Sequence, residues 1–160
     1  MSKDFIYQHI INQKYGVLST ISPDHKPESA FVGIAITKDF EIIFDTVKTS
    51  RKYHNLVANK NVSFVIGWEN ETTVQYEGKA QELSGPEGEY YKEIYFEAWP
   101  DGRDRLKWPG IVHFVIKPSW IRYSNFNKPQ VIEEMGGLET LSNCELVRLA
   151  SDQNHQLQSH

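Results

Sequence analysis

The spacing of hydrophobic residues changes along the chain and predicts a fold made mainly of strands. Residues 3–14 carry Phe5, Ile6 and Ile10 at helical spacing, which indicates a short helix. From Val17 onward the period changes to two, so that successive residues fall on opposite faces, as in a strand. The same reasoning predicts further strands, so that the full set covers residues 17–22, 29–37, 40–46, 62–68, 72–83 and 110–126.

The first three predicted strands should lie side by side. Residues 23–27 read Pro-Asp-His-Lys-Pro and predict a turn, because proline fixes φ and aspartate bonds to the nearby backbone. The stretch 29–37 is apolar on both faces, so we expect a central, buried strand. A tight turn at Lys38-Asp39 leads to the third strand, and the three strands then form an antiparallel meander.

The whole chain is expected to form one antiparallel barrel with helices around it. Ser50 is a predicted N-cap of a helix that ends near Asn61, and a further helix is predicted over 85–98. Six strands joined by short turns favour a closed or nearly closed barrel, which removes exposed strand edges. We therefore expect a mainly β domain over residues 1–135, with a short extra strand at 131–135. Residues 136–160 are expected to be a tail. The leucines between 138 and 149 predict a small helix there, and the end of the tail is polar.

Composition sets limits on the class of protein. The chain has 160 residues and a mass of 18.5 kDa, about one domain. The longest apolar run, 30–36, is too short for a membrane span, and the N-terminus lacks the pattern of a signal peptide. With Cys144 as its only cysteine the chain has no internal disulfide, so we expect a cytoplasmic protein. A net charge of −4 argues against a protein that coats nucleic acid.

The segment that joins the third strand to the next helix is the best candidate for chemistry. A helix N-terminus presents free N–H groups and a partial positive charge, which suit a phosphate. Ser50, Arg51 and Lys52 add a hydroxyl and two cations there. Cations in a first turn oppose the helix dipole, and a bound anion would relieve that cost. The alternative interpretation is a solvated basic turn in which Ser50 is an ordinary cap.

Other polar residues give weaker signals. The six histidines show no spacing typical of metal ligands, so no metal site is expected. His113 lies in the last predicted strand, where a hydrogen-bonded structural histidine is the preferred interpretation over one facing a cleft. Residues 103–108 form a second basic stretch, interpreted as a solvated loop rather than a second anion site.

The segment 46–52, Thr-Val-Lys-Thr-Ser-Arg-Lys, followed by Asn55-Leu56 and Asn59, resembles the signature of the pyridoxamine 5′-phosphate oxidase-like flavin-binding split barrels. The wider resemblance covers roughly residues 5–125. It includes Val17-Leu18-Ser19-Thr20-Ile21, Pro27-Glu28-Ser29-Ala30, Val62-Ser63-Phe64 and Gly78-Lys79-Ala80. The resemblance implies a six-stranded FMN-binding split barrel that works as a homodimer, with FMN in the clefts between subunits. The general-stress-protein branch of this family is the nearest match.

The resemblance also assigns roles to single residues. Arg51 and Lys52 would hold the FMN phosphate, with Ser50 and Thr46 beside them. The second strand would follow the ribityl chain and the flavin ring, and Asp45 would lie near the phosphate or ring. Thr73 stands where the family often has a glutamine that reaches the flavin from the other subunit. The implied cofactor-binding set is Ala30, Phe31, Val32, Gly33, Asp45, Thr46, Ser50, Arg51, Lys52 and Thr73.

This sequence also departs from the family pattern. Oxidases that act on pyridoxamine phosphate carry arginine where Ala30 stands, lysine where Ala35 stands and arginine near Tyr95. Activity on that vitamin is therefore not expected, and no catalytic acid or base can be named. An FMN-dependent oxidoreductase acting on a small molecule is the leading hypothesis. The alternatives are a non-catalytic flavin-binding protein related to stress and a reductase that uses a deazaflavin coenzyme.

Overall fold

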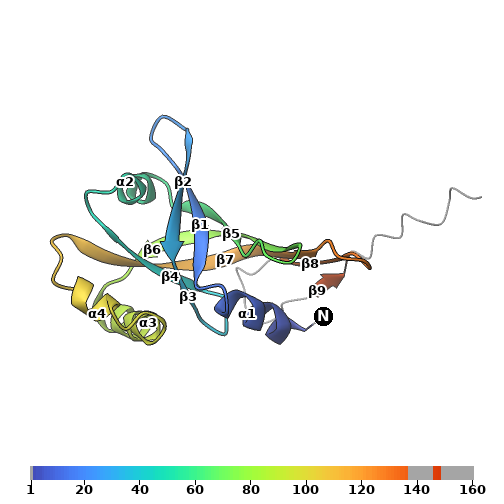
Figure 1. Cartoon of the computed structure of the whole chain (residues 1–160). Helices are drawn as coiled ribbons and strands as arrows, with labels where there is room; N and C mark the ends of the chain where they lie inside the picture. Colours follow the sequence, from blue (N-terminus) through green and yellow to red (C-terminus); the bar gives the residue numbers. More distant parts are fainter. Residues whose placement is uncertain (1, 137–145, 149–160) are drawn as a thin grey trace, which may run out of the picture.

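The fold is a single curled antiparallel sheet with helices along its sides (Figure 1). The computed structural model describes residues 2–136 and 146–148. The strands are β1 (Tyr15–Ile21), β2 (Pro27–Gly33), β3 (Ala35–Ile36), β4 (Ile42–Val47), β5 (Asn61–Ile66), β6 (Thr72–Glu82), β7 (Ile111–Asn125), β8 (Val131–Gly136) and β9 (Leu146–Arg148). The helices are α1 (Lys3–Ile11), α2 (Arg51–Ala58), α3 (Gly85–Ala98) and α4 (Gly102–Arg105).

The strand order bends the sheet into a split barrel. The strands follow the order β2-β1-β5-β6-β7-β4-β3, and each pairing is antiparallel. The chain passes directly from β2 to β3 through Ile34, whose N–H donates to the carbonyl of Lys14 at 2.8 Å. The two ends of the order are thus joined by one continuous piece of chain. The predicted mainly β fold with an antiparallel split barrel is confirmed, with more strands than the six expected.

The prediction for the second strand is wrong in two respects. The stretch breaks at Ile34 into β2, which pairs with β1, and β3, which pairs with β4. β4 then pairs with β7, so the first three predicted strands do not form a meander. β2 lies at an end of the strand order, where the side chain of Phe31 is 61% exposed. A strand with apolar residues on both faces can be an edge strand when its outer face carries aromatic residues, and alternation cannot distinguish the two cases.

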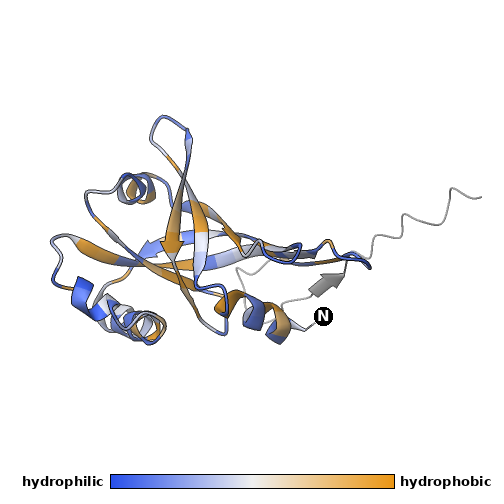
Figure 2. Ribbon diagram, in the orientation of Figure 1, coloured by the Kyte–Doolittle hydropathy of each residue, from blue (hydrophilic) through white to orange (hydrophobic). Residues whose placement is uncertain are grey.

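The hydrophobic core has two parts because β4 is buried on both faces. One face of β4, with Phe44, packs inside the barrel against Phe64 of β5. The other face, with Ile43, packs beneath α3 in a smaller cluster with Tyr95 and Phe96. Figure 2 shows hydrophobic colour on parts of the strands and of the helices that lie along them. β4 therefore carries neighbouring side chains to two different environments.

β6 and β7 form a long ribbon that β8 and β9 extend beyond the barrel (Figure 1). β8 confirms the predicted short strand. Leu146–Arg148 form β9, paired with β8, and not part of the expected small helix. The rest of the expected tail lies outside the described residues, and the division of the chain at 135 stays a prediction. Within the described ranges, no helix has the length and apolar character that crossing a membrane requires.

Candidate functional site

The end of β4 is tied to the start of α2 by a pair of hydroxyl groups. Ser50 has extended backbone angles, and its Oγ accepts from the N–H of Tyr53 at 3.2 Å, which makes it the N-cap. The Oγ1 of Thr46 lies 2.9 Å from the same Ser50 oxygen. The predicted cap is therefore confirmed. Because both hydroxyls bond to each other, the strand and the helix meet in a fixed geometry.

The first turn of α2 presents positive charge toward solvent. The first N–H groups of a helix have no acceptor within the helix, and Ser50 satisfies only that of Tyr53. By the same rule, the N–H groups of Arg51 and Lys52 have no acceptor within the helix. The first turn contains no acidic residue to offset the helix dipole. This geometry suits a phosphate group, as the sequence predicts.

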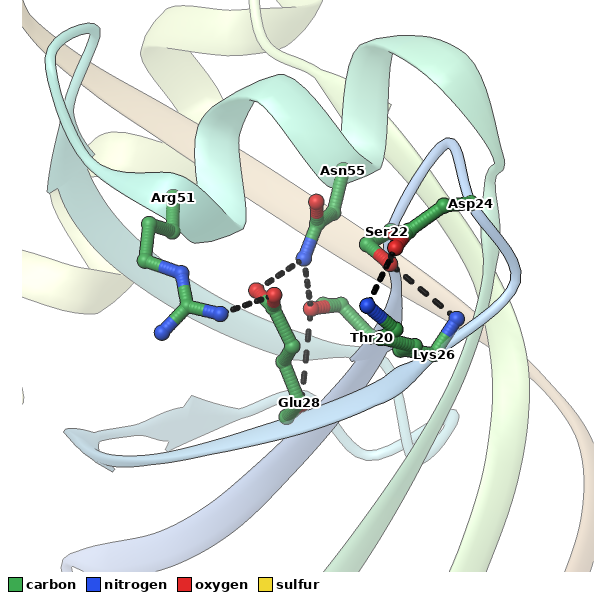
Figure 3. A network of polar contacts seen from close by, with 7 residues as sticks. All are labelled: Thr20, Ser22, Asp24, Lys26, Glu28, Arg51 and Asn55. Atoms are coloured by element: carbon green, nitrogen blue, oxygen red, sulfur yellow. Dashed lines mark hydrogen bonds and ion pairs between the residues drawn. The ribbon is translucent and has the colours of Figure 1, made fainter.

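Two residues that the sequence analysis did not single out as site residues join this turn (Figure 3). Glu28 of β2 accepts a charged hydrogen bond from the guanidinium of Arg51. The other carboxylate oxygen of Glu28 accepts from Nδ2 of Asn55 at 2.8 Å. Asn55 lies one helical turn after Arg51, so both face the hairpin of β1 and β2. That spacing of four residues was the local signal for Asn55, whereas Glu28 was marked only by its place in the Pro27-Glu28-Ser29-Ala30 motif.

The four predicted residues on β2 divide between its two faces. Val32 is buried in the barrel, and Ala30 packs against the same core. Phe31 faces outward and stacks on Tyr15, with ring centroids 4.8 Å apart and planes inclined by 16°. Gly33 contacts the indole of Trp99. All four positions lie on a strand at the edge of the sheet. The backbone of an edge strand is available to a ligand or a partner.

Asp45 does not join the group at α2 through its side chain. Successive side chains of a strand point to opposite faces, so Asp45 turns away from Thr46. Its carboxylate accepts from Nε of Arg105 at 2.8 Å, in an ion pair whose two side chains are mostly buried. Nη2 of Arg105 donates to the hydroxyl of Tyr95 at 3.1 Å. Burial, with the charge of Asp45, raises the pKa of Tyr95 well above its usual value, so this hydroxyl stays protonated.

Thr73 also lies apart from α2 within one chain. It pairs with Ser124 near the far end of β7, whereas Thr46 pairs with Val112 near its start. At about 3.3 Å per residue, these two points on β7 are separated by roughly 40 Å of strand. Thr73 can meet the group at α2 only if a second copy of the chain supplies it.

The remaining candidates are structural in this fold. His113 is 4% exposed and makes edge contacts with the rings of Tyr95 and Phe96. Its burial is as expected, but its Nε2 has no hydrogen-bond partner among the described residues, and burial lowers its pKa. Arg103 of the second basic stretch pairs with Glu93 on α3. Within the part of the chain that the structure describes, no group of three or more possible ligands could hold a metal ion.

Comparison with known proteins identifies a matching family and several solved structures with a similar fold. The family model for pyridoxamine 5′-phosphate oxidase matches residues 3–125. A pyridoxamine 5′-phosphate oxidase-related, FMN binding protein from Nostoc punctiforme PCC 73102 has a TM-score of 0.72 at 11% identity, covering 93% of this chain and 97% of that one. General Stress Protein 26 from Bacillus anthracis str. Sterne has a TM-score of 0.63 at 25% identity, covering 92% of this chain and 98% of that one.

A heme binding protein from Mycobacterium smegmatis has a TM-score of 0.73 at 15% identity, over 86% of this chain. This chain spans only 59% of the length of that protein. A search of curated protein sequences finds no match. The family model covers most of the chain and fits the observed split barrel, and the chain therefore belongs to the pyridoxamine 5′-phosphate oxidase family.

Proposed function

We propose that this protein binds FMN, with the phosphate at the start of α2 and the ring along β2. Ser50, Arg51 and Lys52 would hold the phosphate, and Thr46 fixes the turn through its bond to Ser50. The carrying observation is this hydroxyl pair beside a helix N-terminus that bears two cations and no acid. The backbone of Ala30–Gly33 would follow the ribityl chain and the ring edge. Bound FMN would supply the capacity to accept a hydride or electrons and pass them on.

A homodimer is part of this proposal. The outer face of β1, β2 and β5 carries exposed Tyr15, Phe31 and Val65, with Trp68 beside them. A group of exposed apolar side chains of this kind marks an interaction surface. A second copy packed on it would cover these rings and could bring its own Thr73 toward the start of α2. Light scattering after gel filtration tests the dimer, and Phe31→Glu should shift the protein toward a monomer.

The direct test is the absorbance spectrum of the purified protein, followed by titration with FMN and with riboflavin. Riboflavin lacks the phosphate, so it separates the two halves of the site. Replacing both Arg51 and Lys52 by Ala should weaken FMN binding by about 100-fold, because charge-assisted bonds to phosphate are strong, and should leave riboflavin binding nearly unchanged. Equal FMN affinity in the variant would refute the phosphate assignment. A heme-type spectrum, with no flavin bound, would instead place this chain with the heme-binding member of the fold.

We further propose a flavin-dependent oxidoreductase that acts on an unidentified small molecule. Loss of the visible absorbance band of the oxidised flavin on addition of NADH or NADPH would support it. A flavin that stays oxidised with both donors would favour a non-catalytic binding protein, and competition with a deazaflavin would test the other coenzyme. Oxidation of pyridoxamine phosphate is not proposed. Ala35 and Tyr95 lie in the packed cluster beneath α3, and the guanidinium that contacts the Tyr95 hydroxyl, that of Arg105, is already paired with Asp45.

A further inference from the structure

Glu28 forms an ion pair with Arg51, one of the two cations on which the proposed phosphate site depends. Its carboxylate takes a charged hydrogen bond from Arg51, whose side chain is 82% exposed, while that of Glu28 is 20% exposed. Among the described residues, Glu28 is the only side chain paired with this guanidinium. An anion that approaches the start of α2 therefore meets an arginine whose charge is partly neutralised by the protein itself.

The carboxylate is held on its other side by a buried amide. Asn55 is 3% exposed, and its Nδ2 donates both to Glu28 at 2.8 Å and to Oγ1 of Thr20 at 3.0 Å. Thr20 lies directly opposite Glu28 in the β1–β2 pairing and is itself buried. Figure 3 shows this chain of contacts, which holds the carboxylate of Glu28 against α2. Of the two partners in the ion pair, Arg51 is the one free to move.

The charge of Glu28 persists at neutral pH. The amide of Asn55, followed by the guanidinium of Arg51, lowers the pKa of this carboxyl, and partial burial opposes the effect. The site therefore contains a fixed carboxylate, a mobile guanidinium and a helix N-terminus. Glu28 takes Nη2 of Arg51, so a ligand phosphate must share this guanidinium with the carboxylate, and the two anions repel each other.

We propose that Glu28 is an internal competitor for Arg51 that limits the affinity of the anion site and favours a doubly charged phosphate over a singly charged carboxylate. On binding, Arg51 leaves the carboxylate and turns to the phosphate, while Asn55 keeps Glu28 in place. A doubly charged phosphate attracts Arg51 more strongly than the carboxylate of Glu28 does. A singly charged ligand carboxylate attracts Arg51 no more strongly than Glu28 does. This inference rests on the proposed FMN site and adds a residue that limits it.

The test compares wild type with Glu28→Gln. The glutamine side chain has the same shape and retains an oxygen that can accept from Asn55, but it carries no charge. We expect E28Q to bind FMN about three- to fivefold more tightly, the range of a partly exposed ion pair, and to bind riboflavin as wild type does. If Glu28 had a merely structural role, E28Q would change the affinities for FMN and for riboflavin in parallel. Arg51→Ala should then weaken FMN binding more in the E28Q background than in wild type.

Asp24→Asn is the matched control. Asp24 lies at the tip of the same hairpin and pairs with Lys26 at 2.7 Å, so D24N removes one negative charge nearby without contacting Arg51. A gain in FMN affinity confined to E28Q supports competition, whereas an equal gain in D24N would assign the effect to net charge and overturn it. FMN affinity in E28Q that equals or falls below wild type would overturn it as well, with the FMN site intact. Absence of FMN binding in wild type and E28Q alike would overturn both the proposed function and this inference.

Discussion

The indole ring of Trp99 lies directly against Gly33, with no room for a side chain at that position. A Cβ added to Gly33 would lie 2.9 Å from Cζ2 of the ring and 3.0 Å from Cε2. The ring cannot easily move away, because its Nε1 donates to the carbonyl of Ile34 at 3.0 Å. Trp99, at the end of α3, thereby fixes the point at which β2 gives way to β3.

Gly33→Ala should therefore destabilise the protein. Overpacking against a tethered ring costs about 1–3 kcal/mol, which urea denaturation can measure. Gly136→Ala is the control, because a Cβ there would lie 3.8 Å from Trp120, an ordinary contact. An unchanged unfolding midpoint for G33A would mean that Trp99 moves aside without loss, and would remove it as the device that fixes β2.

The hydroxyl of Tyr76 holds together two elements of the barrel from within the core. It lies 2.9 Å from the carbonyl oxygen of Phe40 and 3.0 Å from that of Ile116, and the side chain is fully buried. Tyr76→Phe removes the donor and leaves these buried acceptors without it, so we expect a loss of about 1–3 kcal/mol in unfolding free energy. Tyr90→Phe, on the exposed face of α3, should leave thermal stability unchanged. Equal stability of both variants would show that neither carbonyl depends on Tyr76.

The local parts of the site could be predicted from the sequence, and the distant contacts could not. Thr46, Ser50 and Arg51 lie within one strand-to-helix connection, so the spacing of cap and cations places them together. Glu28 reaches Arg51 only because α2 packs across the β1–β2 hairpin. No periodicity in the sequence reports how a helix lies on a hairpin, and so the competing carboxylate was not foreseen.

The same limit explains the error about the second strand. An apolar run fits a central strand and an edge strand equally well until its neighbours are known. The break at Ile34 depends on a hydrogen bond to Lys14 and on the contact between Gly33 and Trp99, both of which join distant parts of the chain. Helix and strand identity followed from spacing for the longer elements but not for α4 or β9, and pairing partners required the folded structure.

The ion pair between Asp45 and Arg105 should contribute to stability. Each side chain is less than one fifth exposed, so the pair lies between the weak surface case and the strong buried one. Asp45→Ala leaves a mostly buried guanidinium with one partner fewer, and we expect a loss of about 1–3 kcal/mol in thermal unfolding. FMN titration of the same variant distinguishes a role in stability from a role in cofactor binding. Weaker FMN binding at unchanged stability would assign Asp45 to the cofactor, as the family resemblance implies.

Stability should fall as the pH is lowered through the range near 6.5, because His113 resists protonation in the folded state. Burial lowers its pKa from the usual 6.5; the charges of Lys92 and Arg105 act in the same direction, while Asp45 and Glu89 oppose them. Below 6.5 the unfolded chain takes up a proton that the folded chain does not, so the free energy of unfolding decreases with falling pH by at most about 1.4 kcal/mol per unit. The loss ends once the pH passes below the lowered pKa. Urea denaturation between pH 5 and 8 (a range of about one and a half units on either side) measures this slope.

His113→Phe tests the source of that slope. Phenylalanine keeps a ring against Tyr95 and Phe96 and removes both the titrating group and the unpaired Nε2. The variant should therefore lose part of the pH dependence, and the remainder is expected from His9, whose pKa burial also lowers. His54→Gln, an exposed change on α2, should retain the full slope. If H113F kept the wild-type slope while H54Q lost it, the acid sensitivity would arise at the surface of α2 and not in the cluster beneath α3.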